Sequence, residues 1–322
     1  MLKIGALKLK SNLILAPMSG ITDLPFRMLN RKFGCAFAFT EMLNVRSVSY
    51  KSKRLKEMLA FDQKDTPLGI QILGCEPNYI LKALEVLHKY KFDLLDFNAA
   101  CPAKKVARRG EGASLLKEPK KLCGLLKLIV KNSAVPVTVK IRSGWDDNSL
   151  NAREVSLLAQ DAGVSAVFIH GRTKMQGYSG TVDYLTIGKI KKELKIPVIA
   201  SGNIFNAQLA KKMLDETGCD GLLIARGALG NPWIFKEIKE YLAKGKITER
   251  PKISRIAQIM IRHLHSYTEF YGERNAVIKF RKFFSWYTKS LRNIRHLREK
   301  ASLTKAEAGM VLVVRKIIDR VF

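Results

Sequence analysis

The chain has 322 residues, 47% of them hydrophobic, which is enough for one barrel or for a large domain with a small one. Its 57 Lys and Arg against 28 Asp and Glu give a formal net charge of +29, which favours a polyanionic partner unless the source proteome is lysine-rich throughout. Five cysteines without a CxxC pair exclude a disulfide scaffold, and with no signal-peptide pattern and no membrane-length apolar run we expect a cytoplasmic protein without a membrane span.

Eight apolar runs recur along the first 230 residues. They are continuous rather than alternating, as is typical of parallel strands buried on both faces. Amphipathic segments of helix length separate most of them, for example 78–90, 119–132, 152–162 and 206–216. This alternation favours an α/β fold of the TIM (β/α)8 barrel type over a doubly wound open sheet. The predicted strands are 13–18, 35–42, 67–73, 94–100, 136–144, 166–172, 197–203 and 221–229.

The pattern changes beyond Pro232, where no β-rich run remains. The segments 254–271, 275–298 and 305–321 predict helices, after a polar break near 244–252. Residues 241–322 hold 19 basic and 6 acidic residues, so this tail is denser in positive charge than the preceding chain. We therefore predict a catalytic barrel domain, 1–244, followed by a small, basic, all-helical domain, 245–322. The alternative is that these helices only complete the barrel.

Polar residues gather at the carboxyl ends of the predicted strands, where barrel enzymes carry their chemistry. Lys140 and Arg142 are two residues apart on one strand and so point the same way, as do His170 and Arg172 on the next. The other residues in such positions are Pro17, Met18, Ser19, Glu41, Gln71, Asn98, Cys101, Ser201, Gly202, Asn203, Ala225 and Arg226.

Several of these residues have more than one interpretation. A lysine in mid-strand needs a partner, either an electron-rich cofactor ring or an ion pair with Glu41. His170 is either a site residue or a satisfied core histidine. The turns "ASGNIFN" (200–206) and "ARGALGNPW" (225–233) suit a phosphate site. No GxGxxG follows a strand, no P-loop occurs, and the five histidines are dispersed, so we expect neither a Rossmann domain nor a metal site.

Six motifs follow one another in order along the predicted barrel: "LAPMSGITDLPFR" (15–27), "GIQILG" (69–74), "DFNAACPAKKV" (96–106), "VKIRSGW" (139–145), "FIHGRTKMQGYSG" (168–180) and "ARGALGNPWIF" (225–235). Together they resemble the tRNA-dihydrouridine synthases, and "CPAKKV" resembles the bacterial B-type branch.

The resemblance implies an FMN-binding barrel with a helical tRNA-binding domain. It implies an oxidoreductase that reduces the C5–C6 double bond of specific uridines in tRNA to 5,6-dihydrouridine, using NADPH. By motif, Cys101 is the proton donor to C5 and Asn98 helps to place the uracil. The residues implied to bind FMN are Pro17, Met18, Ser19, Gln71, Lys140, His170, Ser201, Gly202, Asn203, Ala225 and Arg226.

The chain departs from the family pattern at three turns. Ala100 stands before the cysteine where glycine is usual, Ser201-Gly202-Asn203 replaces Asn-Gly-Asp, and Ala225 replaces a glycine. These changes bear on the hydrogen bonds to the cofactor's ribityl and phosphate groups, and leave Cys101, Lys140 and His170 in place.

Basic residues predict where RNA binds. A uridine in folded tRNA must be extruded to reach a flavin, and Lys104, Lys105, Arg108 and Arg109, just after Cys101, suit the phosphates around it. Arg142 and Arg172 are further candidates at the mouth. In the tail, Arg292, Arg295 and Arg298 recur every three residues and predict one helix face. We expect a monomer. Two alternatives stay open: an FMN reductase of a small pyrimidine, as in dihydroorotate dehydrogenases, and a non-catalytic nucleic-acid-binding barrel.

Overall fold

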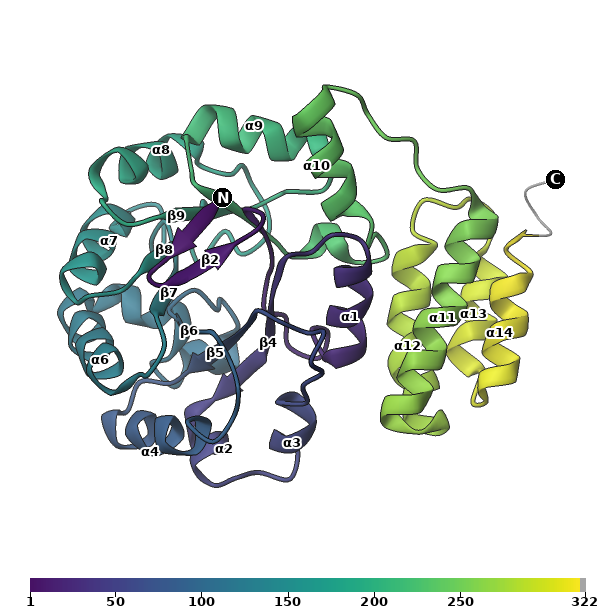
Figure 1. Cartoon of the computed structure of the whole chain (residues 1–322), viewed down its shortest axis with the longest axis horizontal. Helices are drawn as coiled ribbons and strands as arrows, with labels where there is room; N and C mark the ends of the chain where they lie inside the picture. The colour runs from purple at the N-terminus through teal and green to yellow at the C-terminus, as the bar shows by residue number, and fades with distance from the viewer. Residues whose placement is uncertain (319–322) are drawn as a thin grey trace.

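A closed barrel of eight parallel strands forms the larger part of the chain in the computed structural model, which describes residues 1–318 (Figure 1). The strands neighbour one another in chain order, and β10 pairs with β3 to close the barrel. This confirms the predicted TIM-barrel fold. The strands are β3 (Leu13–Leu15), β4 (Phe37–Asn44), β5 (Leu68–Leu73), β6 (Leu94–Asn98), β7 (Val137–Arg142), β8 (Ala166–His170), β9 (Val198–Ser201) and β10 (Gly221–Ile224).

An antiparallel hairpin precedes the barrel and was not predicted. Its strands, β1 (Leu2–Ile4) and β2 (Leu7–Leu9), have only three residues each, too few for a clear alternation. Their apolar side chains join the cluster inside the barrel that includes Phe37 and Phe168. Gly5, in the hairpin turn, lies against Pro136 just before β7. The hairpin therefore covers the amino ends of the strands and leaves the carboxyl ends open.

Helices follow most strands and surround the barrel (Figure 1). Four of the described helices begin at a side-chain cap: Asp23, Asn44, Asp183 and Asn206 each accept a hydrogen bond from a backbone N–H in the first turn. Gly218 ends α9 in the left-handed conformation. The barrel helices are α1 (Leu24–Lys32), α4 (Pro77–Leu87), α6 (Pro119–Asn132), α7 (Ala152–Asp161), α8 (Tyr184–Glu193), α9 (Ala207–Thr217) and α10 (Ile234–Lys244).

Short helices occupy several loops between these elements. They are α2 (Val45–Ser49), α3 (Leu55–Met58), α5 (Lys104–Ala107), and the 3-10 turns η1 (Gly112–Lys117) and η2 (Arg226–Ala228). None of the helices within residues 1–318 has the length and apolarity needed to cross a membrane.

Four further helices form a bundle beside the barrel, after a connecting segment at 246–252 (Figure 1). They are α11 (Ile253–Tyr271), α12 (Glu273–Tyr287), α13 (Arg295–Leu303) and α14 (Glu307–Arg315). The end of the predicted 305–321 helix lies outside the described residues. We call residues 253–315 the tail helices. They do not complete the barrel, because a helix already follows each of its strands, with the short α2 and α3 after β4.

The predicted helix 275–298 was wrong, because the chain turns within it. α12 ends at Tyr287 and α13 begins at Arg295. Asn293 lies between them with φ of 54°, a left-handed conformation that asparagine tolerates better than most residues. The turn lets Leu297 and Ala301 of α13 pack inward. Arg292 consequently lies in the turn and does not share a helix face with Arg295 and Arg298.

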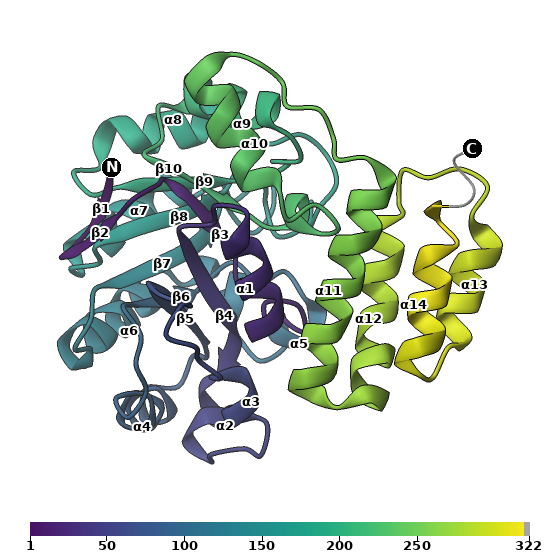
Figure 2. The same ribbon diagram turned by 45° about the vertical axis from the view of Figure 1, so that its right-hand side comes forward.

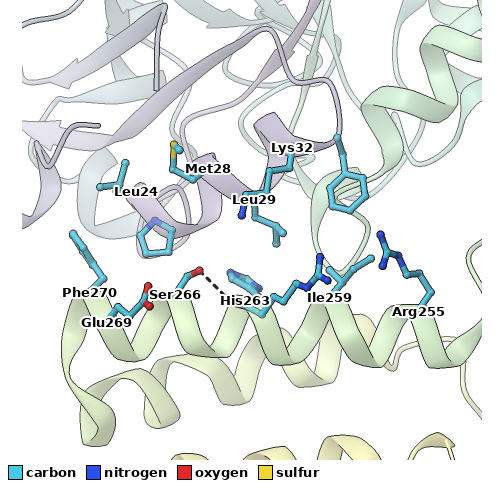
Figure 3. A pocket seen from close by; sticks show the side chains of 13 residues that line it. Leu24, Met28, Leu29, Lys32, Arg255, Ile259, His263, Ser266, Glu269 and Phe270 are labelled. Atoms are coloured by element: carbon cyan, nitrogen blue, oxygen red, sulfur yellow. Dashed lines mark hydrogen bonds between the residues drawn. The ribbon is translucent and has the colours of Figure 1, made fainter. Parts of the chain in front are cut away.

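The tail helices contact the barrel mainly at α1 (Figure 2). Phe26 of α1 packs against Phe283 and His263, with ring centroids 5.5 and 6.0 Å apart. A pocket of about 460 Å³ lies between α1 and α11, lined by apolar residues such as Leu29 and Ile259 and rimmed by Lys32 and Arg255 (Figure 3).

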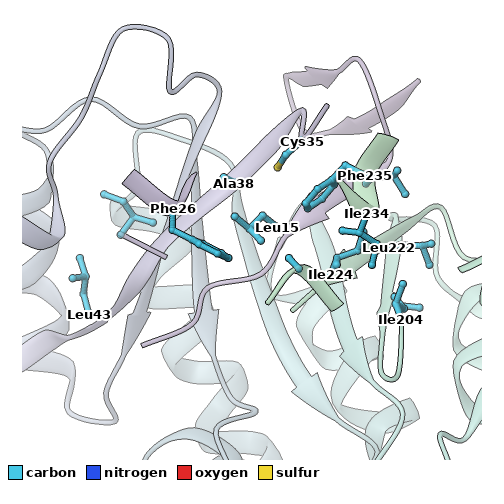
Figure 4. Packing of buried hydrophobic residues seen from close by; sticks show 14 of the residues in the cluster. Leu15, Phe26, Cys35, Ala38, Leu43, Ile204, Leu222, Ile224, Ile234 and Phe235 are labelled. Carbon is cyan, nitrogen blue, oxygen red and sulfur yellow. The ribbon is translucent and has the colours of Figure 1, made fainter. Parts of the chain in front are cut away.

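Buried apolar side chains continue from the barrel into its outer helices without a break. Leu15 and Ala38 of the strands lie near Phe26 of α1, while Leu222 and Ile224 pack near Ile234 and Phe235 (Figure 4). The same cluster extends to the aromatic side chains of the tail, including Phe280, Phe283, Phe284 and Tyr287. These aromatics are therefore core residues, and the tail shares its hydrophobic core with the barrel.

Candidate active site

A pocket of about 400 Å³ opens at the carboxyl ends of the strands. Each of the eight strands, or the loop that follows it, contributes residues to the pocket wall, as the topology of a closed barrel requires. All eleven residues predicted to bind the cofactor line it, together with Asn98, Cys101 and Arg142. They are Pro17, Met18, Ser19, Gln71, Lys140, His170, Ser201, Gly202, Asn203, Ala225 and Arg226.

The pocket is cationic. Lys140, Arg142 and Arg226 line it, and among the described residues that form its wall there is no Asp or Glu. A cavity with this lining favours an anionic or electron-rich ligand over a cationic one, because no carboxylate is present to balance a second positive charge. No group of three or more His, Cys, Asp or Glu within residues 1–318 is arranged to hold a metal ion.

The Lys140 ammonium has no hydrogen bond or ion pair with another described residue. Lys140 is a partly buried residue of β7, and burial, followed by the charge of Arg142, lowers its pKa to about 8. The charges of Asp96 and Cys101 act in the opposite direction. The ion pair with Glu41 does not form, because the Glu41 carboxylate accepts a hydrogen bond from the Gly20 N–H instead. A cation without a partner at the edge of a pocket is available to a ligand.

A chain of hydrogen bonds runs beneath the pocket from Asp96 to Cys101. The Gln71 amide donates to Asp96 Oδ2 at 2.7 Å, and the Asn98 amide donates to Gln71 Oε1 at 2.7 Å. Asn98 Oδ1 then accepts from the backbone N–H groups of Ala100 and Cys101, at 3.0 and 2.8 Å. Thr138 donates to the other Asp96 oxygen at 2.7 Å.

The direction of this chain is fixed by chemistry. A backbone N–H can only donate, so Asn98 must present its oxygen to the turn and its NH₂ to Gln71, which in turn donates to Asp96. Asp96 is fully buried, and desolvation raises its pKa to about 6. Asn98 therefore fixes the turn that carries Cys101, a role that sequence reasoning did not assign to it.

Cys101 is partly exposed and lines the pocket. Its backbone C=O accepts from the Ala113 N–H at 3.2 Å, so the loop at 110–113 packs under it. Gly112 has φ of 59°, and a Cβ there would lie 2.9 Å from the Cys101 carbonyl oxygen, so only glycine fits. Two other thiols differ: Cys35 and Cys219 are buried, and burial raises their pKa, that of Cys35 to about 12.

His170 is a neutral imidazole. Burial, and then the charges of Lys140 and three arginines, lower its pKa to about 2. Arg172 Nη1 lies 3.4 Å from His170 Nε2, and since a guanidinium only donates, Nε2 accepts and the ring proton is on Nδ1. Arg172 is buried, donates to the Gly180 C=O at 2.6 Å, and is not part of the pocket wall.

Arg142 holds two loops together beside the pocket. It donates to the Ala100 C=O at 2.7 Å and to the C=O groups of Thr173 and Gly177, both at 2.9 Å. Most of its donors are therefore used within the protein. It stabilises the residue before Cys101 and the loop after β8 at the same time.

The turns after β9 and β10 form the far end of the pocket. Arg226 Nη2 lies 3.4 Å from Asn203 Oδ1, and its guanidinium also lies over the rings of Tyr178 and Phe205, at 4.6 and 5.3 Å. A Cβ at Gly227 would lie 1.9 Å from the Ile204 carbonyl oxygen, so this glycine allows the two turns to meet.

The basic residues predicted to contact RNA fall into two groups. Lys104, Lys105 and Arg108 are exposed on and beside α5, next to Cys101. Arg109 is exposed too, but pairs with Glu111 at 2.7 Å.

In the tail, Arg292 and Arg295 are exposed. Arg298 is half-buried and donates to the Thr288 C=O at 2.6 Å, so part of it serves the turn between α12 and α13.

Sequence reasoning missed aromatic residues at the mouth. Tyr178 and Phe205 line the pocket and remain 59% and 43% exposed, unlike the buried aromatics of the tail. Trp145 lies outside the pocket wall with the ammonium groups of Lys117 and Lys174 at 3.8 and 4.2 Å from its ring centre. All three aromatics follow predicted strands or lie in the quoted motifs. Their position after the strand ends was the feature of the sequence from which they could have been predicted at the mouth.

Comparison with known proteins agrees with this geometry. The family model for dihydrouridine synthase (Dus) matches residues 14–321. The chain belongs to the dihydrouridine synthase family. It is 38% identical over 304 residues to a probable tRNA-dihydrouridine synthase of Rickettsia conorii, covering 94% of this chain and 92% of that protein. It is 36% identical over 290 residues to tRNA-dihydrouridine synthase B of Pasteurella multocida, covering 90% and 87%. These matches confirm the predicted family, its B-type branch and an oxidoreductase.

Solved structures share the fold of this dihydrouridine synthase family member at low identity. Histamine dehydrogenase from Rhizobium sp. 4-9 superposes with a TM-score of 0.58 at 14% identity, over 84% of this chain and 50% of that one. Morphinone reductase superposes with a TM-score of 0.56 at 13% identity, over 79% and 91%. At this identity the similarity shows the fold alone.

Proposed function

We propose that this protein reduces the C5–C6 double bond of specific uridines in tRNA to 5,6-dihydrouridine, with FMN as cofactor and NADPH as reductant. The observation that carries the proposal is the cationic pocket, free of carboxylates in its wall, in which Lys140 and Cys101 meet at the barrel mouth. The names of the relatives, tRNA-dihydrouridine synthase B among them, support the substrate.

The residues present fit FMN. Arg226, with the turns that Gly202 and Gly227 make possible, suits the phosphate. A Cβ at Gly227 would lie 1.9 Å from the Ile204 carbonyl oxygen, and one at Gly202 would lie 2.9 Å from the Val182 side chain. The Lys140 ammonium, without a protein partner, suits the electron-rich edge of the flavin ring, and His170 is a neutral neighbour. When bound, FMN supplies the hydride that uracil C6 receives.

Cys101 supplies the proton. Reduction of uracil needs a hydride at C6 and a proton at C5, and a thiol held at the pocket wall can act as the general acid that gives this proton. Asn98 and Arg142 bind the N–H and the C=O of the peptide group that joins Ala100 to Cys101, which keeps the thiol at the pocket wall. The reaction balances when NADPH is oxidised to NADP⁺, C6 gains the hydride, C5 gains the Cys101 proton, and solvent restores that proton.

RNA binds around the mouth. The exposed cations of α5 lie directly after Cys101 and suit the phosphates on either side of an extruded uridine. Trp145 lies after β7, and the ammonium groups of Lys117 and Lys174 lie against its ring. This combination of an aromatic ring with positive charge is suited to a nucleic-acid base and its phosphate, and it extends the cationic surface. A reductase of a free pyrimidine would have no use for either surface.

The test compares two cysteines of similar exposure. Cys101→Ala is expected to lower dihydrouridine formation in tRNA by about 100-fold or more, the usual contribution of a general acid, while FMN binding and flavin reduction by NADPH stay within about twofold. Cys123→Ala, on α6 and outside the pocket, is the control and is expected to behave as the parent protein. Near-parent activity of Cys101→Ala would remove Cys101 from the acid role, and a parent protein without bound flavin would overturn the proposed function itself.

A further inference from the structure

The loop that lines the pocket after β3 is held by side chains of the tail helices. Four residues of this loop line the pocket: Pro17, Met18, Ser19 and Ile21. The loop makes a tight turn, in which the Met18 C=O accepts hydrogen bonds from the N–H groups of Ile21 and Thr22, both at 3.0 Å. We call residues 17–23 the cofactor loop. Its outer side faces α11 and α12.

Both backbone groups of Gly20 are bound by side chains. Its N–H donates to the Glu41 carboxylate of β4, and its C=O accepts from the Lys282 ammonium of α12. Glu41 and Lys282 do not form an ion pair with each other among the described residues; both bind the backbone of Gly20. Gly20 has φ of 71°, so the loop depends on a left-handed residue at the point where both groups bind.

A second contact follows three residues later. Asp23, which caps α1, accepts from the Tyr267 hydroxyl at 2.5 Å and from the Tyr271 hydroxyl at 2.9 Å. Asp23 is buried, and burial raises its pKa to about 6. Both tyrosines belong to α11, so α11 and α12 together hold the two ends of the turn between Ser19 and α1.

Lys282 differs from its neighbours in the tail. Its side chain is half-buried, and burial lowers its pKa. Lys279, one turn earlier, reaches Glu57 at 3.7 Å and the Tyr271 ring at 4.1 Å. Lys300 is exposed in the last turn of α13. Of these three lysines, Lys282 alone contacts the cofactor loop, and it does so through a carbonyl that no other described residue binds.

We propose that Lys282 is a positioning residue that fixes the cofactor loop, so that the tail helices set how tightly and in what orientation the pocket binds its flavin. This inference rests on the proposed function of the pocket. Without the ammonium, the Gly20 carbonyl is released, and Met18 and Ser19, which directly precede it, are free to shift within the pocket wall. The tail is then part of the cofactor site as well as a candidate RNA surface.

The experiment measures FMN affinity and the visible circular dichroism of bound flavin for the full-length protein without RNA. Lys282→Met is expected to weaken FMN binding by about tenfold or more and to change the dichroism, since small displacements of positioning groups are costly. Lys282→Arg, which can still donate to the carbonyl, is expected to recover most of the affinity. Lys300→Met, an exposed tail lysine, is the control and should match the parent protein.

Unchanged affinity and dichroism in Lys282→Met would overturn the positioning role while leaving the proposed function intact. If the parent protein itself fails to bind FMN, the proposed function fails instead. If Lys282→Met does not fold, Tyr271→Phe tests the same inference, because it removes the hydroxyl that donates to Asp23 at the end of the cofactor loop. An FMN affinity weakened by about threefold supports the inference, and an affinity equal to that of the parent protein contradicts it.

Discussion

The cations of the barrel mouth and those of the tail helices differ in their partners. At the mouth, Lys140 has none among the described residues, and the exposed cations of α5 are mostly free. In the tail, Arg281 donates to the Thr304 C=O at 2.8 Å, Arg298 to the Thr288 C=O, and Lys282 to Gly20. The net charge of the tail therefore overstates its free cationic surface, because several of its cations stabilise turns or the pocket wall.

The largest effect at the mouth is expected from Asn98→Ala. It frees the backbone N–H groups of Ala100 and Cys101 and leaves Gln71 Oε1 without its donor, so the thiol loses its fixed place. We expect turnover on saturating tRNA to fall by about 100-fold, as for a misplaced catalytic group. The measurement is the rate of dihydrouridine formation, with FMN content as the control. Parent-like turnover would show that the hydrogen-bond chain does not position Cys101.

The next effect concerns Lys140 and pH. Burial lowers its pKa to about 8 in the free protein, below the ordinary 10.5, so it is charged below pH 8 and loses the charge above. A ligand that binds the ammonium raises that pKa, so affinity for FMN should be full below pH 8 and fall by up to about tenfold per pH unit above it. Lys140→Arg should flatten the profile, because arginine stays charged.

Lys140→Met should show weak FMN binding at every pH between about 7 and 9. Titration by flavin fluorescence measures all three proteins. A parent profile that rises with pH, or an identical slope in Lys140→Arg, would contradict the role of Lys140.

Charge-reversal substitutions at the mouth and in the tail should both weaken RNA binding, and their effects compare the two regions directly. Lys104→Glu with Lys105→Glu at the mouth, and Arg292→Glu with Arg295→Glu in the tail, are each expected to weaken tRNA binding by about tenfold. Each pair should also lower the slope of log affinity against log salt by about 1.4, since about 0.7 is lost per phosphate contact on single strands. Flavin reduction by NADPH should be unaffected. An unchanged salt slope for either pair would remove that region from the RNA surface.

Arg298 should behave as a structural residue, which gives the smallest effect. Arg298→Ala removes the bond to the Thr288 C=O and is expected to lower the free energy of unfolding by about 1.5 kcal/mol. Its effect on the salt slope should be less than that of the Arg292 and Arg295 pair. Chemical denaturation measures the first and tRNA binding the second. A stability equal to the parent protein with weakened RNA binding would return Arg298 to the RNA surface.

The sequence could predict the pocket because a barrel brings every strand end to one place. Once the eight runs are ordered, residues as distant as Met18 and Arg226 must meet, whatever the details of the loops. It could not show that Asn98 binds the Cys101 turn, because that depends on which atoms of neighbouring strands face each other.

The tail was harder to predict for a different reason. A three-residue spacing indicates a shared face only if the helix is continuous, and the turn at Asn293 interrupts it. Nor could spacing reveal that Lys282 binds Gly20, a contact between residues far apart in the chain.

The most direct test of the account is an anaerobic single turnover. The protein loaded with FMN is reduced by one equivalent of NADPH and mixed with unmodified tRNA, and flavin absorbance is followed while dihydrouridine is counted by mass spectrometry. The account predicts that flavin is reoxidised as one uridine per flavin gains two hydrogen atoms, and that Cys101→Ala keeps its flavin reduced. Reoxidation of the Cys101→Ala flavin by tRNA at the parent rate, with dihydrouridine formed, would contradict it.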